Sequence, residues 1–99
     1  MRLTPSQQTL LKEAVIEVCG EDAQVYVFGS KLDDTKKGGD IDLLVKINHF
    51  VSNPALIAAK IQAKAMLSLG EQKVDVLIQA PNLESLPIHE VALAQGVLL

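Results

Sequence analysis

Two apolar segments that carry acidic residues constrain this 99-residue chain more than any other feature. Asp40 and Asp42 stand at the start of an apolar run over residues 41–45. Because successive side chains of a strand point to opposite faces, these two aspartates share one face, with Cα atoms roughly 6.5 Å apart. Asp75 repeats the pattern in a second apolar run over residues 74–78. If the two strands are neighbours, three carboxylates meet on one face of a sheet.

Carboxylates in such apolar strands need a partner, because an unpaired charge near a core is costly. The hard oxygens of carboxylates are ligands that divalent cations prefer, so one or two bound metal ions would remove that cost. The Asp-x-Asp pattern alone is a weak signal, since it also occurs at strand starts and turns. The third strand-borne aspartate therefore makes Asp40, Asp42 and Asp75 a predicted metal site.

A third apolar run, over residues 25–28, ends in Gly29-Ser30. Because Gly29 has no side chain, backbone N–H groups at this turn can approach phosphate oxygens closely. Ser30 would add a hydroxyl donor, although its alternative role is only to cap the turn. Lys31, Lys36 and Lys37 cluster in the next segment. For these lysines, a phosphate contact and a solvated surface loop are equal alternatives. The sequence thus predicts a phosphate site at Gly29, Ser30 and Lys31.

Helix caps and hydrophobic periodicity predict the secondary structure. Thr4 to Gln7 reads as a capping box with proline at the first helical position. The predicted helices cover residues 5–19, 54–69 and 87–95, and the predicted strands cover residues 24–28, 40–47 and 73–79. The apolar side of the middle helix is expected to comprise Leu56, Ile57, Ile61, Met66 and Leu67.

Strand directions follow from the need for a shared site. Gly29-Ser30 ends the first strand and Asp40 begins the second, so these strands should be antiparallel. Asp42 and Asp75 both lie near the starts of their strands, which should then be parallel and joined by a right-handed helical crossover. The predicted fold is α/β (α+β), with a small mixed sheet of three or more strands flanked by helices in the order α-β-β-α-β-α.

Size and composition narrow the function further. Residues 1–99 are expected to form a single domain, too small to add a second, substrate-holding one. The net charge of −3 and pI near 5.2 argue against nonspecific nucleic-acid binding, which depends on lysine and arginine. No stretch resembles a signal peptide or a membrane span, so a cytoplasmic protein is expected. Surface or partner-facing roles are expected for His49 and His89. The apolar tail is expected to complete the core, although part of it could face a partner; it comprises Val91, Leu93, Val97, Leu98 and Leu99.

The motifs Phe28-Gly29-Ser30, Asp40-Ile41-Asp42 and Val74-Asp75-Val76 together resemble the nucleotidyltransferase superfamily of DNA polymerase beta. The resemblance covers nearly the whole chain and is greatest to the smallest members, the minimal nucleotidyltransferase (MNT) domains. It implies the nucleotidyltransferase fold, with Asp40, Asp42 and Asp75 as catalytic metal ligands. One departure is visible: nine residues separate Gly-Ser from Asp-x-Asp, where ten are usual.

The resemblance also implies an activity. A magnesium-dependent nucleotidyltransferase, with two Mg²⁺ ions and ATP as substrate, would transfer AMP to a hydroxyl group. MNT domains are typically encoded beside a helical HEPN protein, and in several pairs the MNT antitoxin adenylylates a tyrosine of the HEPN toxin. The alternatives are a non-catalytic antitoxin that neutralises its partner by binding, and a small-molecule (antibiotic) nucleotidyltransferase.

Overall fold

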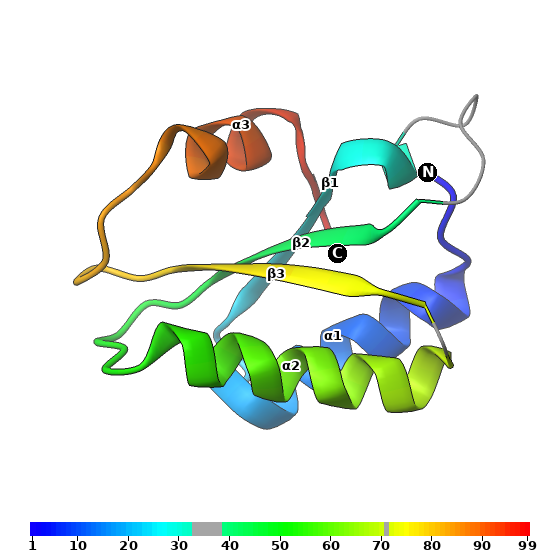
Figure 1. Ribbon diagram of the computed structural model, residues 1–99, viewed down its shortest axis with the longest axis horizontal. Coiled ribbons are helices and arrows are strands. Elements are labelled where there is room, and N and C mark those ends of the chain that lie inside the picture. The colour runs from blue at the N-terminus through cyan, green and yellow to red at the C-terminus, as the bar shows by residue number, and fades with distance from the viewer. Residues whose placement is uncertain (33–38, 71) are drawn as a thin grey trace.

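The computed structural model describes residues 1–32, 39–70 and 72–99. Within these ranges the chain folds into three α-helices, one 3-10 turn and four strands (Figure 1). In chain order they are α1 (Pro5–Cys19), β1 (Gln24–Phe28), η1 (Gly29–Leu32), β2 (Ile41–Lys46), α2 (Pro54–Leu69), β3 (Val74–Gln79), α3 (Pro87–Gln95) and β4 (Val97–Leu98). The predicted mixed α/β class and the order α-β-β-α-β-α are confirmed, with β4 as an addition.

The four strands form one sheet in the order β3-β2-β1-β4. β1 and β2 are antiparallel, whereas β2 and β3 are parallel and connected through α2. Both directions are those that a shared carboxylate site requires. The sheet therefore brings the start of β2, the start of β3 and the end of β1 to the same end of the sheet.

The final strand was not predicted. Val97 and Leu98 pair with β1 in antiparallel fashion, and the backbone N–H of Leu99 donates to the carbonyl of Val25 at 2.8 Å. Val91, Val97 and Leu98 are exposed, so the expectation that the tail completes the core is wrong for these three residues. Only Leu99 packs against the core. Gly96 permits this path, because a Cβ there would collide with the carbonyl oxygen of Ala92.

The helices form two layers around the sheet. α1 and α2 cover one face, and α3 lies over the other (Figure 1). The capping box of α1 is present, with the Gln7 N–H donating to Thr4 Oγ1 at 3.1 Å and the Thr4 N–H donating to Gln7 Oε1 at 2.9 Å. Asn53 caps α2 in a similar way, since its Oδ1 accepts from the Leu56 N–H at 3.1 Å. Of the described helices, none combines the length and apolarity needed to cross a membrane.

The main core lies between the sheet and the α1–α2 layer. Its fully buried members alternate along the strands and recur along the helices: Leu11, Val15, Val27, Ile41, Leu43, Val45 and Ile61. The predicted apolar side of α2 is partly wrong, because Leu56, Met66 and Leu67 are exposed, Leu67 to 88%. α2 is apolar around most of its circumference, so periodicity alone did not identify the face that Ile61 and Ala65 turn inward.

The α3 layer is fastened by a histidine. His89 is buried, which contradicts the expected surface role, whereas His49 is exposed. The Leu86 N–H donates to His89 Nδ1 at 3.0 Å, and His89 Nε2 lies 3.1 Å from the carbonyl oxygen of Ile78. Because Nδ1 accepts and a carbonyl can only accept, Nε2 carries the proton and donates. The neutral ring thus joins the first turn of α3 to β3.

Candidate active site

The predicted carboxylates lie on the face of the sheet opposite to α1 and α2. Ile41 and Leu43 point into the core and are fully buried, so Asp42 projects to the other face. Asp40 precedes β2 by one residue and lies two residues from Asp42. Its side chain is 45% exposed. The apolar alternation of β2 therefore fixes the direction of Asp42.

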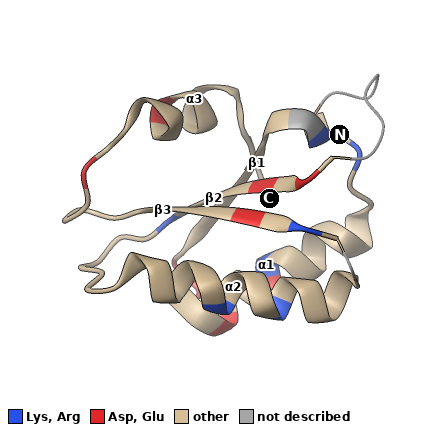
Figure 2. Ribbon diagram, in the orientation of Figure 1, with Lys and Arg blue, Asp and Glu red and all other residues tan. Residues whose placement is uncertain are grey.

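Asp75 lies beside Asp42 in the neighbouring strand. The two residues are register partners in the parallel pair β2–β3, and strands in a sheet are about 4.8 Å apart. Partners in adjacent strands project to the same face, so both carboxylates reach the same space. Figure 2 shows the acidic positions of β2 and β3 side by side. The structure thus brings Asp40, Asp42 and Asp75 together.

Gly29 borders this group from the third strand. Phe28, the last residue of β1, pairs with Asp42, so Gly29 follows directly beside that carboxylate. A Cβ at Gly29 would collide with Asp42 Oδ2, and the φ of +77° is one that side-chain-bearing residues rarely adopt. Both observations require glycine here. The predicted phosphate turn and the predicted metal ligands are therefore in contact.

The other predicted phosphate-site residues are described less fully. The backbone of Ser30 lies in η1, and its side chain lies outside the described part of the structure. Lys31 is only 7% exposed, and its carbonyl accepts from the Arg2 N–H at 2.7 Å, so the solvated-surface alternative does not fit it. Lys36 and Lys37 lie outside the described residues. The phosphate roles of Ser30 and Lys31, and the effect of the shortened spacing, stay predictions.

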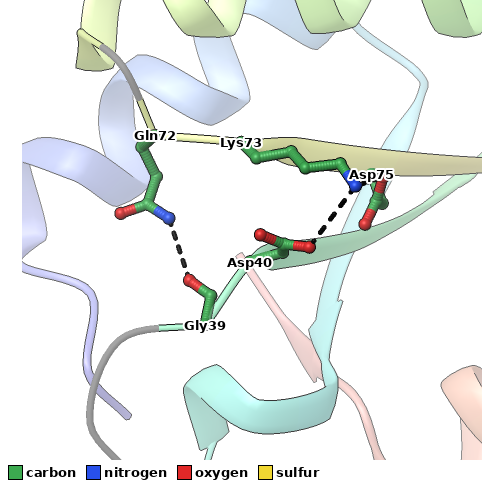
Figure 3. A network of polar contacts seen from close by, with 5 residues as sticks. All are labelled: Gly39, Asp40, Gln72, Lys73 and Asp75. Atoms are coloured by element: carbon green, nitrogen blue, oxygen red, sulfur yellow. Dashed lines mark hydrogen bonds and ion pairs between the residues drawn. The ribbon is translucent and has the colours of Figure 1, made fainter.

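A lysine that the sequence analysis did not single out completes the group. Lys73 Nζ lies 3.6 Å from Asp40 Oδ2 and 3.9 Å from Asp75 Oδ1 (Figure 3). Lys73 precedes β3 and lies two residues before Asp75, so alternation places both side chains on one face. That two-residue offset was the available signal. A lysine before a strand otherwise reads as an ordinary solvated residue.

Neighbouring contacts fix the two strand starts to each other. Gln72 Nε2 donates to the carbonyl of Gly39 at 2.9 Å (Figure 3), and the Ile41 N–H donates to the carbonyl of Lys73 at 3.0 Å. These bonds link the residues just before β2 to those just before β3. The spacing between Asp40 and Asp75 is consequently held by neighbouring backbone as well as by the lysine.

The carboxylates influence one another electrostatically. Burial raises the pKa of Asp42 above its usual range, and the negative charges of Asp75 and Asp40 raise it further, while Lys73 opposes the change. The group thus contains more negative charge than its surroundings neutralise. A further cation placed among these oxygens would be stabilised.

The residues fit a divalent metal ion chemically, although they do not yet surround one. Among the described residues, no three acidic, histidine or cysteine side chains are already gathered closely enough to hold a metal. The donor set of three carboxylates is nevertheless the hard-oxygen type that Mg²⁺ selects. The raised pKa of Asp42 and the ammonium group of Lys73 between two carboxylates both indicate that this place favours positive charge.

Comparison with known families agrees with this geometry. The chain matches the nucleotidyltransferase domain family over residues 10–94, which includes all three aspartates and Gly29. The protein therefore belongs to the nucleotidyltransferase domain family, and its fold is the nucleotidyltransferase fold. None of the curated proteins with which it was compared matches it.

Proposed function

We propose that this chain is a magnesium-dependent nucleotidyltransferase that moves AMP from ATP to a hydroxyl acceptor. Family membership supports nucleotidyl transfer in general. The observation that carries the proposal is the register pairing of Asp42 with Asp75, with Asp40 on the same face and Gly29 against the Asp42 carboxylate. This arrangement would receive a metal-bound triphosphate beside a turn that lacks a side chain.

Each aspartate has a proposed role. Asp40 and Asp42 would hold Mg²⁺, with Asp75 as a further ligand; the bound metal would neutralise phosphate charge and help to align the triphosphate. Asp75 would also accept the proton of the attacking hydroxyl. The acceptor oxygen then forms a bond to the α-phosphorus, the bond from that phosphorus to the bridging oxygen breaks, and its electron pair leaves with pyrophosphate.

The exposure of the site is compatible with a large acceptor. The side chains of Asp40 and Asp75 are 45% and 47% exposed, so a hydroxyl carried by another macromolecule can reach them. Together with the resemblance to MNT domains, this supports a tyrosine of a HEPN-type partner as the proposed acceptor. The chain would then act as an antitoxin that modifies its toxin.

One observation favours a second function, that of a non-catalytic binder. Lys73 already gives two of the carboxylates a positive partner without any metal. A chain without catalytic activity could keep its fold because Lys73 offsets the charge of these carboxylates. Such a chain would neutralise its partner by binding to it alone. The two functions differ in whether a nucleotide is transferred.

Intact mass spectrometry separates these functions. The purified chain is incubated with ATP, Mg²⁺ and the product of the neighbouring gene. We expect the partner to gain about 329 Da, the mass of one AMP adduct formed by attack at the α-phosphorus. The Asp40→Asn, Asp42→Asn double variant should still co-purify with the partner but leave its mass unchanged. If the wild type adds no mass and the double variant neutralises the partner fully, the chain is a binder.

A further inference from the structure

The ammonium group of Lys73 lies where two carboxylates could share a cation. It is 3.6 Å from Asp40 Oδ2 and 3.9 Å from Asp75 Oδ1. Figure 3 shows the Lys73 side chain extending toward both aspartates. Charge-assisted hydrogen bonds between ammonium and carboxylate are shorter, at about 2.7–2.9 Å. The ammonium is therefore held by attraction between charges and not by close hydrogen bonds. Its side chain is 67% exposed, so it can leave at small cost.

The position of the carboxylates does not depend on this ammonium. The Lys73 carbonyl accepts the Ile41 N–H at 3.0 Å, and the Gln72 side chain donates to Gly39 at 2.9 Å. Asp75 itself lies within β3, paired in register with Asp42. If the lysine side chain turned away, these contacts would keep Asp40 and Asp75 near each other. The flexible four-carbon stem of lysine allows that movement.

A metal ion placed between Asp40 and Asp75 would compete with this ammonium for the same oxygens. A divalent ion bound by Asp40 and Asp75 would repel a positive group placed between the same carboxylates. Metal binding there would therefore favour a position of the Lys73 side chain away from these carboxylates.

We propose that Lys73 is a built-in counter-ion that competes with the metal ion for Asp40 and Asp75. In the metal-free protein it offsets repulsion among the carboxylates, and it thereby weakens the binding of a free divalent ion. Lys73 is a positioning residue in this role. The inference rests on the proposed function only in taking these carboxylates as the metal site.

A manganese titration followed by electron paramagnetic resonance tests the competition without using activity. The full-length wild type is compared with Lys73→Met, which keeps the length of the side chain and removes its charge. In this variant the two exposed ion pairs of Lys73 no longer compete with Mn²⁺ for Asp40 and Asp75. The variant should therefore bind Mn²⁺ about three- to tenfold more tightly. Lys64→Met is the matched control: Lys64 pairs with Glu17 at 2.9 Å, on the α1–α2 layer, so its loss should leave Mn²⁺ affinity unchanged.

The outcomes separate this inference from the proposed function. Unchanged or weaker Mn²⁺ binding by Lys73→Met overturns the competition. If Asp42→Asn abolishes the Mn²⁺ binding seen in the wild type, the proposed metal site still stands in that case. Lys73→Gln serves as a second variant if Lys73→Met does not fold. The titrations are repeated with a non-hydrolysable ATP analogue. Failure of every variant and the wild type to bind Mn²⁺ in both series overturns the inference and the proposed metal site together.

Discussion

The two ends of the β2–β3 pair are built differently. At the carboxyl end, the Asn82 side chain bonds both backbone groups of Val51, with its Oδ1 accepting from the N–H and its Nδ2 donating to the carbonyl, each at 2.8 Å. At the amino end, the corresponding side-chain contacts are the Gln72–Gly39 bond and the long ion pairs of Lys73. Backbone bonds cross between the strands at both ends.

The difference separates stability from function. The carboxyl end closes two connecting segments with short, partly buried hydrogen bonds, and His89 adds the attachment of α3. The amino end leaves partly exposed carboxylates, an exposed lysine and a glycine turn together, as the proposed ligand site requires. Substitutions at the amino end should therefore change the chemistry, whether or not they also change stability, whereas substitutions at the carboxyl end should change unfolding and leave the chemistry intact.

The largest expected effect is on nucleotide transfer. Asp42→Asn should abolish Mg-nucleotide binding and transfer, because it removes a charged metal ligand. Asp75→Asn should slow transfer by about 10²-fold or more, the scale of a general base, while reducing nucleotide affinity less. Labelled-ATP transfer and calorimetric titration measure the two quantities. Equal loss of binding in both variants would show that Asp75 serves chiefly as a metal ligand.

Gly29→Ala should disturb both stability and the site. The strained φ and the collision with Asp42 together should lower the free energy of unfolding by about 1–3 kcal/mol, and transfer should fall as well. Gly70→Ala is a matched control, because Gly70 has a similar φ of +79° but no atom within 4 Å of an added Cβ. Chemical denaturation compares the two variants. The same loss in both would mean that the contact with Asp42 contributes nothing.

Asn82→Ala should affect unfolding and spare transfer. The substitution leaves the N–H and carbonyl of Val51 without their partner, which should cost about 1–3 kcal/mol. Denaturant unfolding gives the stability, and the transfer assay at a temperature where the variant is folded gives the activity. A folded Asn82→Ala protein with greatly reduced transfer would contradict the division between the two ends.

The smallest expected effect is a pH dependence of stability. The pKa of Asp42 is higher in the folded protein than usual, so its ionisation opposes folding. This carboxyl therefore favours the folded state most below its unfolded pKa, and that advantage is lost as the pH rises through its folded pKa. Asp42→Asn removes this pH-dependent loss of stability. The free energy of unfolding of the variant, relative to that of the wild type, should therefore increase from about pH 3 to pH 7.

Because the carboxyl is partly solvated, the gain of Asp42→Asn at neutral pH should stay below about 1 kcal/mol. Thermal or denaturant unfolding across this pH range measures it. Asp22→Asn, at an exposed position between α1 and β1, is the control and should show a smaller change. A relative stability that falls as the pH rises would contradict the assigned electrostatics.

The sequence predicted most of the fold because its signals are local. Proline, the Thr4 capping box and the terminal glycines gave the bounds of α1, α2 and α3, and alternation gave the face of Asp42 and Asp75. β4 was missed because two residues have no periodicity. The inward face of α2 was missed because apolar residues occur on several of its sides.

The site was predicted less completely than the fold. Aspartates in apolar strands are conspicuous because burial of their charge needs an explanation. Lys73 gives only the weak signal of its two-residue offset from Asp75, and its other partner, Asp40, lies at the start of another strand, more than thirty residues away. His89 was assigned to the surface because neither of its backbone partners can be recognised in a sequence. Both roles depend on contacts that only the folded structure creates, between Lys73 and Asp40 and between His89 and the Ile78 carbonyl.

Calorimetric titration of the full chain with a magnesium-bound, non-hydrolysable ATP analogue tests the central claim most directly, because it needs no acceptor. The account predicts saturable, magnesium-dependent binding to the wild type and its loss in the Asp40→Asn, Asp42→Asn double variant, with circular dichroism showing that the double variant is folded. Wild-type affinity in that folded double variant would contradict the assignment of the carboxylates as the nucleotide and metal site.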